Sequence, residues 1–318
     1  MQIWHQIWHK VWGYIYGQDE YFLDLHDINH KLYWEKCGNS TATPILVIHG
    51  GPGAGGNISL RRFFNPIKYN IIIFDQRGSG RSLPSASIKN NTTQHLIEDI
   101  EVLRKHLKIK KWILFGGSWG SALALAYAQK YKENVLSMIL RGIFLCSKEE
   151  IEWFLYKIKI IFPEYWNNFV SILNEKEKQN ILKSYYRKLT NPDPKIHTPA
   201  AIVWTRYEAN CSTLLPNDSI TAKFSDTKMA LSLARIESHY FINNLFLEEG
   251  QLLKNMKKIK NIPGILVQGR YDAICPPENA FKLHKAWENS KLKIVEKAGH
   301  SALDKNIQET LLKTMLEL

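Results

Sequence analysis

A serine, an acid and a histidine that could together cleave an acyl bond occur in this order along the chain. Ser118 lies in the pattern Gly116-x-Ser118-x-Gly120, between a short apolar run (112–115) and a segment rich in helix formers (122–131). A serine in this pattern occupies a sharp strand-to-helix turn that exposes its hydroxyl group. Side chains at Gly116 and Gly120 would collide with the neighbouring strand and helix, so we predict a strained turn that requires glycine. The alternative is a glycine- and serine-rich turn without chemistry.

Asp272 and His300 each follow a later apolar run, at 263–269 and 292–296. A serine hydroxyl is a weak nucleophile, so Ser118 needs a base that takes its proton, and we predict that His300 is this base. A carboxylate must then fix the histidine tautomer and stabilise the imidazolium, a role that we assign to Asp272. Asp272 alone could cap a turn, and His300 alone could be a hydrogen-bonded surface histidine. The candidate catalytic set therefore depends on the three residues occurring together.

A carbonyl oxygen under attack also needs two preorganised N–H donors, an oxyanion hole. The backbone N–H of Trp119, directly after Ser118, is the first candidate donor, because the following helix points its N-terminal dipole at this position. We assign the second to Gly51, in a glycine run that follows the apolar strand 44–48. A dinucleotide site is the alternative for this run, but Pro52 fits a loop better than a helix start. For His49 we predict a structural hydrogen bond within the loop.

The elements that must position these residues are apolar strands alternating with helices. We predict strands at 21–26, 31–36, 44–48, 69–75, 112–115, 135–140, 263–269 and 292–296, and helices at 92–107, 122–131 and 276–287. Strand, loop, helix and strand in this order build a mostly parallel sheet with helices on both faces. Gly51, Ser118, Asp272 and His300 all fall at carboxyl ends of predicted strands, where ligands bind in such sheets. This convergence is the strongest argument for one active site.

The sheet pattern is interrupted between residues 143 and 257 by a helical, aromatic and lysine-rich stretch with proline breaks. We predict an α/β-hydrolase fold with an inserted helical cap domain, because the chain order serine, acid, histidine is the order of that fold. Residues 1–142 would form the first part of the α/β core, 143–257 the cap, and 258–318 the second part of the core.

Composition narrows the functional classes. The chain has 318 residues, a net charge of +12 and a pI near 9.3. The positive charge is mostly lysine spread along the chain, so we expect no nucleic-acid partner. We see no apolar run of about 18 residues and no signal peptide, so we expect no membrane span and a cytoplasmic protein. The four cysteines are scattered without metal-ligand spacing, so we expect neither a metal nor a cofactor.

Residues 1–16 carry tryptophan and aliphatic residues at three- and four-residue spacing, which is typical of a helix with one apolar face. The simpler interpretation is that this face packs onto the protein itself. Binding to a membrane surface or to a partner is the alternative.

Several longer motifs resemble the proline iminopeptidases (prolyl aminopeptidases), which are serine peptidases of the α/β-hydrolase fold. The matching stretches span nearly the whole chain from about residue 20: 49–53 (HGGPG), 75–82 (DQRGSGRS), 116–121 (GGSWGS), 140–145 (LRGIFL), 234–241 (ARIESHYF), 268–276 (QGRYDAICP) and 298–301 (AGHS). The resemblance implies release of an N-terminal proline from peptides through an acyl-enzyme. It implies a free N-terminal proline as the substrate group and no cofactor.

The resemblance also implies substrate-binding residues in the cap. Two glutamates of the family bind the substrate amine, and they match Glu208, in a stretch that reads WTRYE here, and Glu237. Two carboxylates suit the secondary ammonium of proline, because it has two N–H donors. Phe144 matches an aromatic wall of the proline pocket, and Tyr240 lies in the same matched stretch as Glu237. Tyr207 departs from the family, which has a second tryptophan there.

Two other functions stay open from the sequence. An esterase or amidase of the same fold, acting on small non-peptide acyl substrates, would have the same triad. A non-catalytic binding protein of this fold usually lacks a triad residue, and this chain has all three. Epoxide hydrolases and dehalogenases need an acid at position 118, so Ser118 argues against them. The oligomeric state is not predicted.

Overall fold

The computed structural model describes residues 21–25, 30–216 and 226–317. The amphipathic stripe predicted at residues 1–16 lies outside these described residues. Among the described residues, no helix has the length and apolar character needed to cross a membrane.

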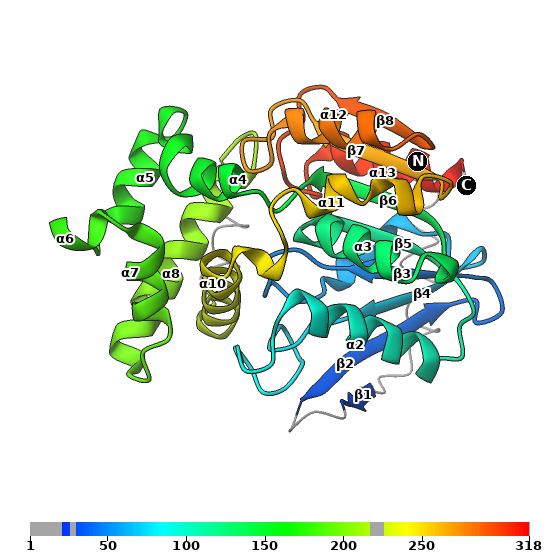
Figure 1. Cartoon of the computed structure of the whole chain (residues 1–318), viewed down its shortest axis with the longest axis horizontal. Helices are drawn as coiled ribbons and strands as arrows, with labels where there is room; N and C mark the ends of the chain where they lie inside the picture. The colour runs from blue at the N-terminus through cyan, green and yellow to red at the C-terminus, as the bar shows by residue number, and fades with distance from the viewer. Residues whose placement is uncertain (1–20, 26–29, 217–225, 318) are drawn as a thin grey trace.

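One eight-stranded sheet forms the centre of the molecule (Figure 1), with the strand order β1-β2-β4-β3-β5-β6-β7-β8. The first two strands are antiparallel to their neighbours, and β3 to β8 run parallel. The strands are β1 Tyr21–Asp24, β2 Lys31–Gly38, β3 Thr43–Ile48, β4 Tyr69–Phe74, β5 Trp112–Ser118, β6 Val135–Ile143, β7 Gly264–Gly269 and β8 Ser290–Val295. The predicted fold class, an α/β-hydrolase fold with a mostly parallel sheet, is confirmed.

Alternate residues of the central strands face two separate hydrophobic cores. Leu46 and Ile72 belong to the core that contains helices α2, α3 and α12. Their neighbours Ile45 and Ile71 belong to the core that contains helix α13 and the 3-10 helix η1. Side chains alternate across a strand, so both faces of the parallel sheet are buried, as predicted. These helices are η1 Ile58–Phe63, α2 Thr93–His106, α3 Trp119–Lys130, α12 Pro277–Ala286 and α13 Lys305–Leu316.

Helix α2 illustrates how the local sequence sets an element. Thr92 caps it, because its side chain accepts a hydrogen bond from the backbone N–H of His95. Leu96, Ile100 and Leu103 repeat at helical spacing and are buried. The helix therefore begins and ends within one residue of the predicted bounds.

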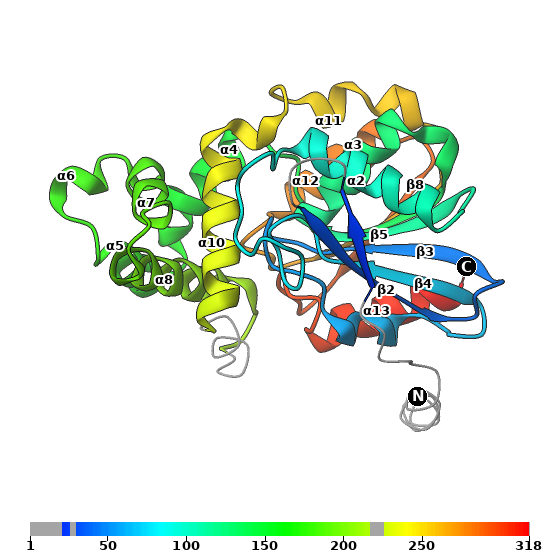
Figure 2. The same ribbon diagram turned by 90° about the horizontal axis from the view of Figure 1, so that it is seen from below.

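A helical insertion separates β6 from β7 and lies at one end of the sheet. In Figures 1 and 2 its helices α5 to α8 extend away from the sheet, with α10 between them and the strands. The insertion contains α4 Lys148–Glu152, α5 Pro163–Val170, α6 Glu175–Lys178, α7 Ile181–Leu189, α8 Pro194–Ser212, α10 Thr227–Ile242 and α11 Gln251–Lys254, with short 3-10 and π segments between some of them. We call residues 143–257 the cap, and the division of the chain at its two ends stays a prediction.

Candidate active site

Ser118 stands in the strained turn that its sequence pattern predicts. Its backbone has φ 57° and ψ −128°, a sparsely populated region for a residue with a side chain. A Cβ atom on Gly116 would lie 2.3 Å from the carbonyl oxygen of Gly120, and one on Gly120 would lie 2.2 Å from the carbonyl oxygen of Ile48. Both flanking positions therefore require glycine, because the strand and helix backbones meet at this turn.

His300 and Asp272 are joined by a hydrogen bond of 2.8 Å between the imidazole Nδ1 and the carboxylate Oδ2. A carboxylate only accepts, so Nδ1 carries the proton and Nε2 is free to act as a base. The other oxygen of Asp272 accepts from the backbone N–H groups of Ile274 and Cys275. Gln268 donates to Oδ2 at 2.9 Å and was not predicted as a site residue. These contacts fix the orientation of the carboxylate.

The loop that carries His300 is held by both the core and the cap. Arg141 on β6 donates from Nη1 to the carbonyl oxygen of His300 at 2.6 Å. The backbone N–H groups of His300 and Ser301 both donate to the carbonyl oxygen of Ser212, at 3.0 and 2.9 Å. Ser212 is the last residue of α8, the cap helix that also carries Glu208. The position of the imidazole therefore depends on the docking of the cap.

Gly142 provides the space that the His300 ring occupies. Its φ is +56°, and a Cβ atom there would lie 2.9 Å from Cε1 and 3.0 Å from Nδ1 of His300. The sequence analysis did not single out this residue, although it lies in the matched stretch 140–145. We call the turn at Ser118 the elbow, with β5 as the elbow strand and α3 as the elbow helix. Only the pairing of β6 beside β5 places Gly142 against the histidine.

We expect Gly142→Ala to lower kcat by about 10²-fold, because the added methyl group displaces the imidazole from its productive position. Gly250→Ala is the matched control. Gly250 also has a positive φ, +70°, but its nearest atom would be 3.6 Å from the new Cβ, on a lysine side chain. Both variants should lose about 1–2 kcal/mol of stability from the backbone conformation, and only Gly142→Ala should lose activity. Equal kcat values for the two variants would contradict this role of Gly142.

The glycine loop after β3 lies directly against the elbow. A Cβ atom on Gly50 would lie 3.4 Å from the Cβ of Ser118. Gly51 has φ +106°, and a Cβ there would lie 2.5 Å from the backbone nitrogen of Gly53, so only glycine fits. Gly51 lines both cavities that contain Ser118. The oxyanion donors assigned to Gly51 and Trp119 stay a prediction.

Hydrogen bonds of His49 and Gln76 join this loop to the elbow helix. His49 donates from Nδ1 to the carbonyl oxygen of Gly50 and accepts from the backbone N–H of Gln76 at Nε2. Burial lowers the pKa of His49, consistent with a neutral ring. The Gln76 amide donates to the carbonyl oxygen of His49 and accepts from the indole of Trp119 at 2.8 Å. His49 therefore has the structural role that the sequence analysis predicts.

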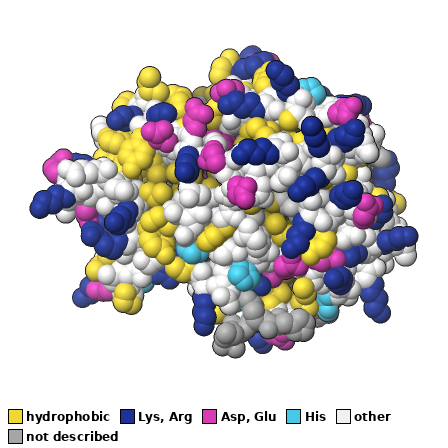
Figure 3. All heavy atoms as spheres, viewed as in Figure 1, with side chains coloured by type: hydrophobic (Ala, Val, Ile, Leu, Met, Phe, Trp, Pro, Cys, Tyr) yellow, Lys and Arg dark blue, Asp and Glu magenta, His cyan; other side chains and the backbone are white. Residues whose placement is uncertain are grey.

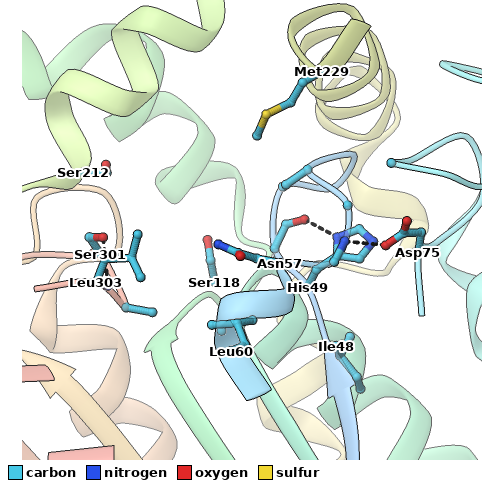
Figure 4. A pocket seen from close by; sticks show the side chains of 18 of the residues that line it. Ile48, His49, Asn57, Leu60, Asp75, Ser118, Ser212, Met229, Ser301 and Leu303 are labelled. Atoms are coloured by element: carbon cyan, nitrogen blue, oxygen red, sulfur yellow. Dashed lines mark hydrogen bonds between the residues drawn. The ribbon is translucent and has the colours of Figure 1, made fainter. Parts of the chain in front are cut away.

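Two cavities meet at Ser118. The larger has a volume of about 600 Å³, is lined by His300 and Gly51, and contains the groups labelled in Figure 4. The smaller, which we call the inner chamber, has a free volume of about 20 Å³. The inner chamber lies under the cap and is lined by Gly51, Ser118, Phe144, Glu150, Phe154, Glu208, Glu237, Phe241, Ile274 and Cys275.

Three carboxyl groups from different cap helices line the inner chamber, those of Glu150, Glu208 and Glu237. Glu150 and Glu237 are buried and Glu208 is half-buried. Glu150 already accepts hydrogen bonds from Ser147 and Asn279, which leaves Glu208 and Glu237 as the candidates for a ligand.

Burial raises the pKa of Glu208 to about 7, and a hydrogen bond with Glu237 opposes that shift. Burial also raises the pKa of Glu237 well above its usual range, and the charge of Glu208 adds to the effect. Trp204 donates its indole N–H to Glu237 Oε2 at 2.6 Å. Among the described residues, Glu208 Oε2 is buried without a hydrogen-bond partner. Buried acceptors nearly always have a hydrogen-bond donor, so this oxygen atom is suited to accept one from a bound ligand.

Three aromatic side chains form part of the walls of the inner chamber. The structure brings Phe144, predicted from the resemblance, together with Phe154 and Phe241, which were not predicted. Phe241 lies in the matched stretch 234–241, so a signal for it existed. No comparable signal existed for Phe154. Tyr207 stacks on Phe169 behind this wall at 4.3 Å and donates its hydroxyl to the carbonyl oxygen of Phe154.

Tyr240 lies away from both cavities, in contrast to its predicted contact with substrate. It is fully buried, packs edge-on against Trp119 at 5.0 Å and donates its hydroxyl to Asn91 Oδ1 at 2.9 Å. Asn91 offers a polar partner on that side of α10, which accounts for the direction of the ring. Tyr240 therefore supports the elbow helix, and we no longer include it among the residues that contact substrate.

The described part of the chain contains no group of three or more His, Cys, Asp or Glu residues placed to bind a metal ion. The expectation of a site without metal or cofactor stays a prediction.

Comparison with known proteins agrees with this architecture. A family model described as the alpha/beta hydrolase fold matches residues 43–307. A proline iminopeptidase of Xylella fastidiosa (strain 9a5c) is 46% identical over 280 residues, which cover 87% of this chain and 90% of the relative. The chain belongs to the proline iminopeptidase family. A plant member, from Arabidopsis thaliana, is 46% identical over 91% of this chain and 77% of its own length. The predicted resemblance to proline iminopeptidases is confirmed.

Solved structures support the fold of this family member without deciding its substrate. The proline iminopeptidase of Mycobacterium smegmatis superposes with a TM-score of 0.67 at 15% identity, over 94% of this chain and 98% of that one. An esterase from Exiguobacterium antarcticum superposes with a TM-score of 0.64 at 19% identity, over 94% and 98%. At such identities the likeness shows the fold alone.

Proposed function

We propose that this chain releases a single N-terminal proline from peptides through an acyl-enzyme on Ser118. The observation that carries the proposal is the pair Glu208 and Glu237, whose carboxyl groups line the chamber beside the nucleophile, Glu237 buried and Glu208 half-buried. A substrate with a free N-terminal proline supplies the cation that such a pair needs, since its ammonium has two N–H donors. The names of the relatives support the same substrate.

The proposed acylation uses Ser118, His300 and Asp272 in the roles predicted from the sequence. Ser118 Oγ attacks the carbonyl carbon of the proline residue while its proton passes to Nε2 of His300. The negative charge on the carbonyl oxygen is stabilised by the backbone N–H groups of Trp119 and Gly51. His300 then gives the proton to the leaving nitrogen, the C–N bond breaks, and the prolyl ester of Ser118 forms. Asp272 accepts a hydrogen bond from the imidazolium throughout and keeps its orientation.

Deacylation reverses these roles with water. A water molecule enters from the larger cavity and gives a proton to His300 as its oxygen attacks the ester carbonyl. The ester bond breaks, Ser118 Oγ regains the proton, and free proline leaves. We call Glu208 and Glu237 together the amine clamp. Because the clamp binds a free N-terminal amine, only the end of a peptide chain can occupy the inner chamber, and the product is one amino acid. The exopeptidase activity thus results from the cap rather than from the triad.

A panel of aminoacyl-naphthylamides with free amines tests the proposed substrate. We expect kcat/KM for the proline derivative to exceed those for leucine and phenylalanine by about tenfold or more. The chamber between Phe144, Phe154 and Phe241 has little free volume, so its walls must move apart for any side chain and least for a compact ring. Leucine or phenylalanine derivatives cut as well as the proline derivative would contradict the proposal.

The carboxyl pair should make the unliganded protein less stable as the pH rises. The folded pKa of Glu208, about 7, lies above the unfolded value of 4.5, so the folded state binds the extra proton between these values. Stability is therefore lost as the pH rises through this window, by on the order of 3 kcal/mol. Glu208→Gln removes the ionisable group. The difference in melting temperature, variant minus wild type, should therefore be larger at about pH 8 than at about pH 5. Calorimetry at both pH values measures the difference, and an equal gain at each would contradict this account.

We also propose a cytoplasmic location. All four cysteines are buried and none forms a disulfide within the described part of the chain, which suits a reducing compartment. On the face in Figure 3, lysine and arginine side chains are interspersed with aspartate and glutamate. Mixed charge of this kind is typical of a solvated surface, and the absence of a nucleic-acid partner stays a prediction.

A further inference from the structure

We propose that the larger cavity binds the residue after the cleaved bond, and that Leu60 and Leu303 make it prefer an apolar side chain there. The proposal rests on the proposed function and deepens it, because it names a second substrate feature that the cavity selects. The inner chamber and the larger cavity share Ser118, Gly51 and Glu208, and the rest of their walls differ.

The direction of the substrate follows from which cavity each group faces. Glu237 and Phe144 line only the inner chamber, so the amine and the ring of the proline belong there. His300 lines only the larger cavity. It must protonate the leaving nitrogen, so that nitrogen and the rest of the peptide lie on the side of His300. The larger cavity is therefore the leaving-group side, and its volume of about 600 Å³ suits a small ligand.

The surface that lines this cavity is mostly apolar. In Figure 4, Leu60 from η1 lies beside Ser118 together with Asn57, and Leu303 and Met229 line the cavity farther away. The wall is extended by Phe115 in the middle of β5 and by Leu311 of α13. Leu303 is 42% exposed, so it has apolar surface that a substrate side chain can cover. An apolar substrate side chain in contact with these groups is removed from water, which stabilises the complex. A charged side chain finds no hydrogen-bond or ionic partner among them.

Apart from Glu208, whose carboxyl group the proposed function assigns to the substrate amine, the charged groups that line the cavity near Ser118 have protein partners. Arg81 donates from Nε to Asp75 Oδ2 at 2.7 Å, and Arg141 donates to the carbonyl oxygen of His300. At the start of α10, Asp226 and Lys228 are exposed and opposite in sign, so they give the cavity no single charge preference. A charged side chain after proline would lose water here and meet only the exposed charges of Asp226 and Lys228, where a counter-charge is worth little.

A panel of dipeptide amides, Pro-X-NH₂ with X as Leu, Phe, Ser, Asp or Lys, tests the proposal by proline release. The C-terminal amide removes the terminal carboxylate as a variable. Full burial of a leucine-sized side chain corresponds to at least about tenfold in kcat/KM, so we expect X as Leu or Phe to exceed X as Asp or Lys by about tenfold or more.

Leu303→Asn and Leu60→Asn should each lower the ratio of kcat/KM for Pro-Leu-NH₂ to that for Pro-Asp-NH₂ by several-fold. Leu136→Asn is the matched control, since Leu136 is 41% exposed and lies near the opposite, amino-terminal end of β6. It should keep the ratio of the wild type. Using two variants keeps the test valid if Leu60→Asn does not fold.

Similar kcat/KM values for all five amides would overturn the proposal and leave proline release intact. An unchanged ratio in both Leu303→Asn and Leu60→Asn would overturn the assignment of these residues. If none of the five amides is cleaved, the proposed function itself fails, and this inference fails with it.

Discussion

Ser118→Ala should lower kcat for proline naphthylamide by about 10³-fold or more, because no other group can form the acyl-enzyme. The fold should be retained, since Ser118 is at the tip of a turn and the alanine side chain lacks only the hydroxyl oxygen. Its melting temperature should therefore stay close to that of the wild type. Kinetics and calorimetry on the same preparation separate loss of chemistry from loss of structure.

The control for this variant is Ser171→Ala, in an exposed cap position outside both cavities. It should keep the activity of the wild type. A fluorophosphonate probe should label the wild type on the peptide that contains Ser118 and leave Ser118→Ala unlabelled. Substantial peptidase activity in pure Ser118→Ala would rule out Ser118 as the nucleophile.

The second large effect is expected at the amine clamp. Glu237→Gln and Glu208→Gln should each lower kcat/KM for proline naphthylamide by about 10²-fold or more, because truncating one partner of a buried charge pair costs about 2–5 kcal/mol. The side chains keep nearly the same shape, and the indole of Trp204 still finds an oxygen acceptor at position 237. The loss is then one of charge rather than of packing.

A neutral substrate separates the clamp from the triad. p-Nitrophenyl acetate has no ammonium group, so its turnover should fall far less than that of proline naphthylamide in both variants. Glu164→Gln, at an exposed position of α5, should affect neither substrate. Equal losses on the ester and on the proline substrate would mean that the two glutamates support the fold rather than the amine.

The sequence predicted the core of the site because strand tips are set by local patterns. Apolar runs that end in Gly51, Ser118, Asp272 and His300 identify the carboxyl edge of a parallel sheet without tertiary information. The glycines at 116 and 120 follow from one sharp turn. The structure reproduces each of these placements.

The residues that hold the site in place were not predictable in the same way. Arg141 and Ser212 contact the loop of His300 from distant parts of the chain, and Gln268, four residues before Asp272, reaches the acid from the end of β7. Such contacts depend on which strands pair and where the cap docks, and no local pattern encodes either.

Tyr240 shows that a residue in a motif shared with the family does not always have the role of its neighbours. It shares a matched stretch with Glu237, and both lie on α10. Phe241, four residues after Glu237, is on the same helix face and lines the inner chamber. Tyr240 instead points toward Trp119 and Asn91. The stretch carries both a substrate contact and a support for the elbow helix, which only the packing distinguishes.

The central claim is that a free proline amine, held by Glu208 and Glu237, positions the substrate for Ser118. The most direct measurement compares proline naphthylamide with N-acetyl-proline naphthylamide on the same enzyme preparation. Acetylation removes the charge and both donors of the amine, which leaves the carboxyl groups of Glu208 and Glu237 without their partner. The account predicts cleavage of the free amine and near-background cleavage of the acetylated substrate. Equal cleavage of the two substrates would contradict it.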